Sequence, residues 1–152
     1  MAKFDLEQAA AVVAIHQLVH EWAHELDVHN GLEAMPDLLT ADVRYAVGGA
    51  QRQSRDEVLA FYRERHARLA ATEEGVPFHR HALHNLRTTF TAPDTAEIAF
   101  GLIYFTTAGN AAGRDHADPA LVSDVTMTCR READGHWRIA AFDSALSFRR
   151  GG

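Results

Sequence analysis

The sequence has almost no cysteine, no run of basic residues and no long apolar segment. Its single cysteine, Cys129, cannot form a disulfide within the chain, which favours a reducing compartment, the cytoplasm. Lys and Arg total 15 against 21 Asp and Glu, a formal net charge of −6, so we expect no nucleic-acid partner. The N-terminal residues mix charges into a helical pattern, so we expect neither a signal peptide nor a membrane span.

Repeats, low-complexity tracts and long linkers are also missing. A chain of 152 residues suits one core, so we expect a single domain over residues 1–152. The glycine spacing fits no nucleophile elbow, phosphate loop or dinucleotide fingerprint. Acid–base catalysis or ligand binding therefore remain as function classes, and the ten histidines are the one compositional excess.

Apolar spacing and turn residues predict helices first and long strands afterwards. The expected elements are helices at residues 5–29, 32–39 and 55–71, and strands at residues 42–47, 78–91, 97–107, 121–131 and 137–148. The turn sequences between the last four strands lie at residues 93–94, 109–119 and 134–135. This order predicts an α+β fold rather than alternating β-α-β units. A strongly curved mixed sheet can wrap the first of three helices as a cone and enclose an apolar pocket.

Several polar residues of the first helix lie beside its apolar stripe. At about 100° per residue, Asp27 falls on the margin of the buried face, where a carboxylate can accept a proton. The alternative is a solvated position without a catalytic role. His16, His20 and His24 recur every fourth residue, a spacing that can bind zinc. No third ligand adjoins them in the expected place, so we interpret them as a polar flank and expect no metal site.

Three further histidines crowd the start of the first long strand. Strict alternation places His79 and His81 on one face and His84, with Leu86 and Phe90, on the other. The apolar neighbours favour the His84 face for the pocket, unless a bulge intervenes. Alternation alone therefore leaves the position of His81 open, and Cys129 on a later strand reads as a buried structural thiol.

The order of motifs resembles a known family. Residues 15–27, IHQLVHEWAHELD, and residues 38–45, LLTADVRY, are similar to the opening of SnoaL-like proteins of the nuclear transport factor 2-like superfamily. Residues 81–86, HALHNL, resemble the family's His-x-x-x-Asn strand, and residues 135–139, GHWRI, resemble its last hairpin. The resemblance covers nearly the whole chain, but this fold hosts many chemistries as well as non-catalytic binders.

Within that superfamily the chain looks most like the branch of scytalone dehydratase, hexachlorocyclohexane dehydrochlorinase and bile-acid dehydratase. Those enzymes use an aspartate at the end of the first helix and a histidine on the following long strand as a dyad without cofactor. The resemblance implies this dyad at Asp27 and His81, placing His81 above His84, and a pocket tyrosine at Tyr45. The second tyrosine of the dehydratases is Leu26 here.

The leading hypothesis is a cofactor-independent lyase, dehydratase-like, or an isomerase, in which His81 takes a proton and Asp27 holds the imidazole. The expected ligand is small and hydrophobic, aromatic or polycyclic, and superfamily members suggest a homodimer or homotrimer. The expected pocket residues are Trp22, His84, Phe61, Phe100, Leu102, Met127 and Phe142.

One alternative is a non-catalytic binding or assembly module, because residues 39–45 also resemble the aromatic-ring dioxygenase small subunit. The other is a polyketide cyclase or ketosteroid-isomerase-like enzyme with a single aspartate base.

Overall fold

The computed structural model describes residues 3–107 and 118–150, so most of the turn expected at residues 109–119 lies outside the described residues. The described chain has an α+β fold, as predicted. Its helices are α1 (Leu6–His29), α2 (Met35–Leu38) and α3 (Arg55–Ala70). Its strands are β1 (Leu39–Val47), β2 (Ala50–Arg52), β3 (His79–Ala92), β4 (Thr95–Thr106), β5 (Pro119–Arg131) and β6 (Trp137–Arg149).

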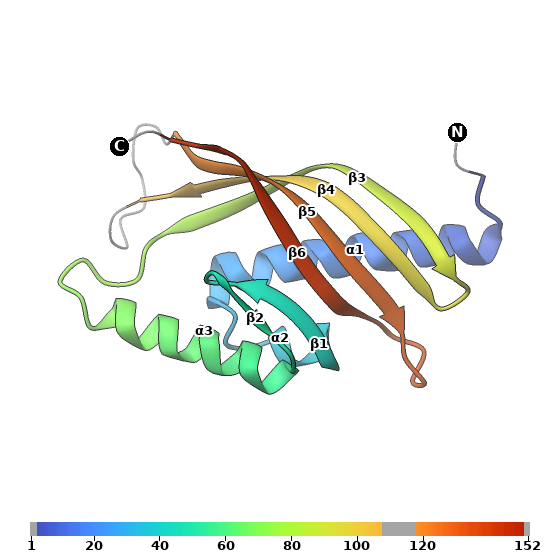
Figure 1. Cartoon of the computed structure of the whole chain (residues 1–152), viewed down its shortest axis with the longest axis horizontal. Coiled ribbons are helices and arrows are strands. Elements are labelled where there is room, and N and C mark those ends of the chain that lie inside the picture. The colour runs from blue at the N-terminus through green and yellow to red at the C-terminus, as the bar shows by residue number, and fades with distance from the viewer. Residues whose placement is uncertain (1–2, 108–117, 151–152) are drawn as a thin grey trace.

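The six described strands form one open, mixed sheet in the order β2-β1-β6-β5-β4-β3. β1 runs parallel to β6, and every other neighbouring pair is antiparallel. The long strands arch across α1, while α3 lies beside the short β1–β2 hairpin, below it in Figure 1. The predicted curved sheet around the first helix is confirmed. None of the described helices is long and apolar enough to cross a membrane.

Helix α1 is held at both ends and along one side. The side chain of Asp5 accepts a hydrogen bond from the backbone N–H of Gln8, and the Gln8 side chain accepts one in return, which forms a capping box. The helix ends at Asn30 in a left-handed conformation, with φ of 58°. Its buried side includes Ile15, Val19, Trp22 and Leu26, and each such burial stabilises the fold by roughly 1.5–3 kcal/mol.

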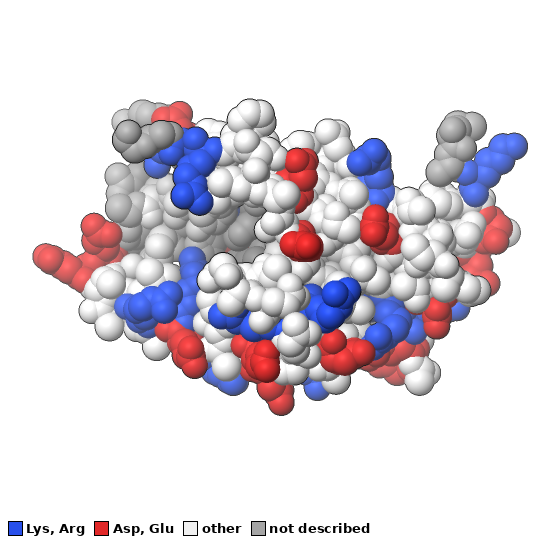
Figure 2. Space-filling model, in the orientation of Figure 1, with Lys and Arg blue, Asp and Glu red and all other residues white. Residues whose placement is uncertain are grey.

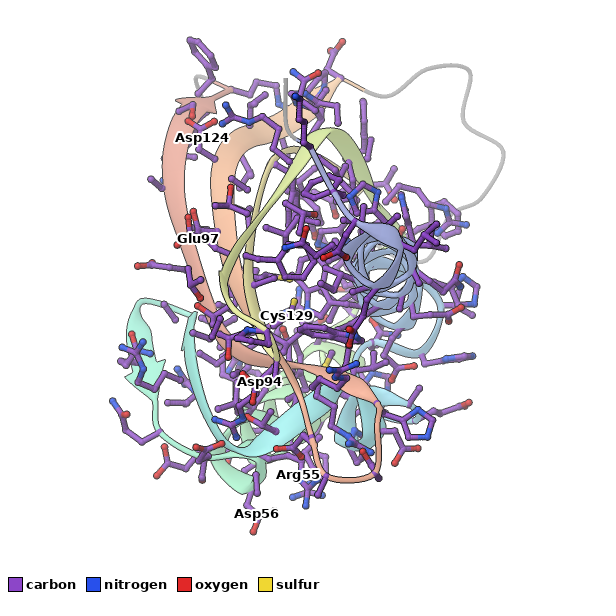
Figure 3. The ribbon with its side chains drawn as sticks, turned by 90° about the vertical axis from the view of Figure 1, so that its right-hand side faces the viewer. Arg55, Asp56, Asp94, Glu97, Asp124 and Cys129 are labelled. Atoms are coloured by element: carbon purple, nitrogen blue, oxygen red, sulfur yellow. The ribbon has the colours of Figure 1, made fainter. Side chains whose placement is uncertain are left out.

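The two faces of the sheet have different surroundings. Glu97 of β4 and Asp124 of β5 lie on the side away from α1, whereas Cys129 lies between the sheet and the helix (Figure 3). Cys129 is completely buried, and this burial raises the pKa of its thiol to about 12. The predicted structural thiol is therefore confirmed, and the core lies between α1 and the inner face of the sheet.

A β-bulge in β3 changes which side chains face inward. Asn85 has a φ of 56°, and the pairing with β4 shifts between His84 and Arg87. Before the bulge His79 and His81 face the interior, and after it Leu86 and Phe90 do. The extra residue thus lets both sets reach the same side. The expectation that the apolar residues would draw His84 inward is wrong for this reason.

The expected end of the first strand at residue 47 is confirmed, but the short strand after it was not expected. The glycines at residues 48 and 49 both adopt positive φ and turn the chain into β2. β2 has three half-exposed or exposed residues, so it carries no apolar pattern to predict it. The short second helix ends at Leu38, since Leu39 already pairs with Ile139 of β6.

Candidate active site

A cavity of about 600 Å³ lies between α1, α3 and the inner face of the sheet. Its opening is the hollow visible between the strands and the α3 side of the molecule in Figure 2. The apolar part of its wall includes Trp22, Leu26, Tyr45, Phe61, Leu102 and Phe142. A volume of this order fits a small organic ligand, and apolar walls with few polar groups are usual for such sites.

Asp27 and His81 meet at one side of this cavity. Asp27 is in the last turn of α1 and His81 is near the start of β3, 54 residues later. Oδ1 of Asp27 lies 2.6 Å from Nδ1 of His81. The backbone N–H of His81 also donates to the same carboxylate, 3.0 Å from Oδ1 and 3.1 Å from Oδ2. The tertiary fold therefore brings the two predicted residues together through three N–H···O contacts.

This arrangement determines which nitrogen of His81 is free. An ionised carboxylate can only accept, so the imidazole donates to Asp27 from Nδ1–H and its Nε2 keeps a lone pair. Nε2 makes no hydrogen bond with any residue that the structure describes. His81 lines the cavity, whereas Asp27 is not among its described lining residues. Asp27 is thus placed to orient His81, and Nε2 is placed to meet a ligand.

Aromatic neighbours hold the His81 ring in place. Its centroid lies 5.9 Å from the Trp22 ring at 61° and 4.9 Å from the Tyr104 ring at 46°. The side chains of His81 and Asp27 are only 14% and 12% exposed. A buried, packed ring loses little further freedom when a ligand binds, which favours a preorganised site.

A chain of hydrogen bonds joins Trp22, Tyr45 and Tyr62 in the cavity wall. Nε1–H of Trp22 donates to the Tyr45 hydroxyl over 2.7 Å, and that hydroxyl lies 3.0 Å from the Tyr62 hydroxyl. Burial raises the pKa of Tyr45 well above its ordinary value and that of Tyr62 to about 12. Both phenols therefore stay protonated near neutral pH. Because one hydroxyl hydrogen is shared between them, the other remains available for a ligand oxygen.

Four of the seven predicted pocket residues line the cavity, and the other three do not. Trp22, Phe61, Leu102 and Phe142 line the cavity. Phe100 and Met127 are buried in the core instead, away from the described lining, because α1 covers that part of the sheet. His84 faces outward beside Gly101, on the opposite face of β3 from His79 and His81.

Several polar lining residues had not been singled out from the sequence. Tyr62 lies one helical turn after Val58, and both are buried, so an i, i+4 pattern on α3 would have revealed it. Asn30 directly follows the expected first helix, and an asparagine at a helix end is too common to indicate a site. Arg65 carried no signal, because a lone arginine on a charged helix is ordinary. The remaining polar lining residues include Gln51, His79, Tyr104, Ser123 and Ser144.

The histidines at every fourth position of α1 do not gather around a common point. His16 instead lies 3.3 Å from the Thr88 hydroxyl, and His20 and His24 are exposed. Burial and then the nearby His20 lower the pKa of His16. Within residues 3–107 and 118–150, no group of three or more His, Cys, Asp or Glu side chains is placed to hold a metal ion.

Comparisons with known proteins agree with this architecture. The SnoaL-like domain profile matches residues 7–143. LinA superposes with a TM-score of 0.73 at 16% identity, over 95% of this chain and 90% of its own. A scytalone dehydratase candidate from Novosphingobium aromaticivorans gives 0.72 at 15% identity, over 93% and 87%. A nuclear transport factor 2-like protein with a cystatin-like fold from the same organism gives 0.66 at 25% identity, over 95% and 92%. No curated protein sequence matches significantly.

Proposed function

Starting from the fact that the chain belongs to the SnoaL-like domain family of the nuclear transport factor 2-like superfamily, we propose that it is a cofactor-independent lyase or isomerase. The proposed substrate is a small hydrophobic molecule with an aromatic or polycyclic skeleton. The observation that carries this proposal is the 2.6 Å contact between Asp27 and Nδ1 of His81, which leaves Nε2 as a base in a cavity of about 600 Å³.

The first step is removal of a proton from a carbon next to a carbonyl. Nε2 of His81 forms the new N–H bond, and the C–H electron pair moves toward the carbonyl. Asp27 stabilises the imidazolium that forms. The free hydroxyl hydrogen of the Tyr45–Tyr62 pair can donate to the oxygen that gains charge.

The second step distinguishes the two reaction types. In a lyase, the electron pair returns to form a C=C bond and expels a hydroxyl group from the next carbon. The imidazolium gives that group its proton, and water leaves. In an isomerase, the imidazolium returns the proton to a different carbon, and His81 regains its starting form in both cases.

The geometry argues against a single aspartate base. Both oxygens of Asp27 already accept N–H groups of His81, and Asp27 does not belong to the described cavity lining. A base must come within hydrogen-bond reach of the proton that it removes. A binding module without catalysis remains the second candidate, favoured by the open cavity alone.

The proposal is tested with a bicyclic β-hydroxy ketone such as 3-hydroxy-1-tetralone. Its dehydration gives 1-naphthol, which is followed by fluorescence, and proton removal alone is followed by deuterium uptake at the α-carbon by NMR. We expect His81→Gln to abolish both signals. Asp27→Asn should lower them by about 10²–10⁴-fold, because an amide cannot stabilise the imidazolium. His84→Gln, outside the cavity, is the matched control and should keep full activity.

Two outcomes would favour the other candidates. Activity that survives in His81→Gln and disappears in Asp27→Asn would support the single-aspartate mechanism. Binding of the ketone with no deuterium uptake in the wild-type protein would support the binding module. For cellular location we propose the cytoplasm, because the chain has one buried cysteine and no intrachain disulfide; recovery of the native protein from a secreted fraction would contradict it.

A further inference from the structure

Several polar side chains line the cavity close to the C-terminus of α1. Three elements contribute these side chains: Asn30 at the end of α1, Arg65 from α3 and His79 from β3, with Tyr62 beside them. We call Asn30, Arg65 and His79 the acid subsite. Its members play no part in the proton transfer described above.

His79 presents a buried acceptor that nothing in the protein satisfies. Its side chain is only 4% exposed, and Nε2 lies 2.7 Å from the backbone carbonyl of Leu26. A carbonyl can only accept, so Nε2 carries the hydrogen and Nδ1 keeps a lone pair. That Nδ1 is buried without a partner. Leaving a buried acceptor unpaired is costly, and His79 lines the cavity, which makes this nitrogen a candidate acceptor for a ligand hydrogen.

Asn30 supplies a second acceptor of the same kind. Its left-handed backbone caps α1, with its N–H bonded to the carbonyl of Glu25, and this accounts for the residue's backbone but not for its side chain. Oδ1 is buried and has no hydrogen-bond partner. The residue also lines the cavity. Two unpaired acceptors therefore lie where α1 ends.

Arg65 adds a positive charge that no acidic side chain balances. It lines the cavity from α3, and it makes no hydrogen bond or ion pair with any described residue. Figure 2 shows basic side chains on the α3 side of the hollow. The charge of Arg65 is close enough to Tyr62 and His79 to lower the pKa of each, although burial is the largest influence on both groups. The other arginine near Tyr62, Arg52, instead donates to backbone carbonyls.

We propose that the acid subsite binds a carboxylate of the substrate at Arg65, and that His79 and Asn30 each accept a hydrogen bond from a hydroxyl group of the same substrate. The ring centroids of His79 and His81 are 5.8 Å apart, so the hydroxyl group bound at His79 lies close to the base. The substrate class is then a hydroxylated aromatic or alicyclic carboxylic acid. This inference depends on the proposed function only in taking the cavity as the substrate site, and ligand binding tests it without turnover.

The experiment compares two ligands of nearly equal shape by isothermal titration calorimetry. 2-Naphthoate carries the charge, and 2-acetylnaphthalene replaces the carboxylate with a neutral methyl ketone. The wild-type protein should bind 2-naphthoate more tightly by roughly 10-fold to 100-fold, since a hydrogen bond to a charged group contributes that much. Arg65→Gln should remove this preference while still binding the ketone, which also shows that the variant is folded. Arg63→Gln changes an exposed arginine of the same helix and should bind like the wild type.

A second comparison examines the acceptors. 6-Hydroxy-2-naphthoate should bind the wild type roughly 2-fold to 10-fold more tightly than 2-naphthoate, and His79→Phe should lose this gain. The Phe side chain keeps a ring at this position but has no lone pair to accept the hydroxyl hydrogen, and binding of 2-naphthoate by the variant shows that it is folded.

The proposal is overturned if the wild type does not prefer 2-naphthoate to the ketone, or if Arg65→Gln keeps the preference. This result does not test the proposed function, which depends on His81 and could fail separately. His81→Gln should retain the 2-naphthoate preference, and only the turnover assays report on the base.

Discussion

The carboxylate of Asp27 makes more contacts with His81 than a dyad requires. It accepts the ring Nδ1–H and, with both oxygens, the backbone N–H of the same residue. An asparagine has only one acceptor oxygen, and its NH₂ group would face another N–H. Asp27→Asn should therefore disturb the orientation of the ring as well as its charge, which is why we expect a large loss from an almost isosteric change.

The buried His79 should make the stability of the protein depend on pH. Burial, the largest influence, lowers the pKa of His79 below its ordinary value of 6.5. The unfolded chain then takes up this proton at a higher pH than the folded chain does. The free energy of unfolding should therefore be highest above about pH 6.5 and fall as the pH decreases below it. His16, whose pKa is also lowered, acts in the same direction.

Urea unfolding at pH 7.5 and pH 5.5 measures this effect. His79→Gln should show a smaller fall in the free energy of unfolding between the two values than the wild type, with His16 responsible for part of what remains. His84→Gln, on the exposed side of β3, serves as the matched control. An unchanged pH response in His79→Gln would contradict the argument.

At the scale of elements, the turn after α1 positions α3 against the cavity. Gly31 has a φ of 80°, and a Cβ there would lie 2.8 Å from Cγ of Tyr62. Tyr62 cannot withdraw easily, because it is 6% exposed and its hydroxyl meets Tyr45. The absence of a side chain at Gly31 thus allows Tyr62 to reach the cavity wall.

Two glycine substitutions separate backbone strain from this contact. Gly75 also has a positive φ, 74°, but a Cβ there would meet no atom within 4 Å. Both Gly31→Ala and Gly75→Ala should cost about 1–2 kcal/mol for the left-handed backbone. Gly31→Ala should cost a further ~1–3 kcal/mol for overpacking against Tyr62. Equal losses in urea unfolding would show that Tyr62 does not depend on Gly31.

At the scale of the whole molecule, the homodimer or homotrimer stays a prediction. The end of β6 exposes two large apolar side chains, with Leu146 51% and Phe148 72% exposed. We expect sedimentation velocity at micromolar concentration to give a dimer or trimer, and Phe148→Glu to shift it toward the monomer by placing a charge in the contact. Leu6→Glu, at a 91% exposed position on α1, is the control. A wild-type monomer would contradict the prediction.

The positions of most elements could be predicted because they depend on local patterns. Ile15, Val19, Trp22 and Leu26 recur at helical spacing, so α1 was predictable from one segment of chain. The half-exposed β2 has no such pattern and was missed. The pairing of β1 with β6 is parallel and joins residues about 100 apart, and no local signal specifies it.

The sequence by itself determined the helix-then-strand order, the apolar side of α1 and, through the family resemblance, Asp27 and His81 as partners. Residue alternation could not place His81 rather than His84 toward the cavity, and the tertiary structure shows the reason, because the bulge at Asn85 interrupts the alternation. The tertiary structure also brought together the three residues of the proposed acid subsite. Asn30, Arg65 and His79 come from three separate elements, and each is ordinary until the fold places their unpaired groups around one cavity.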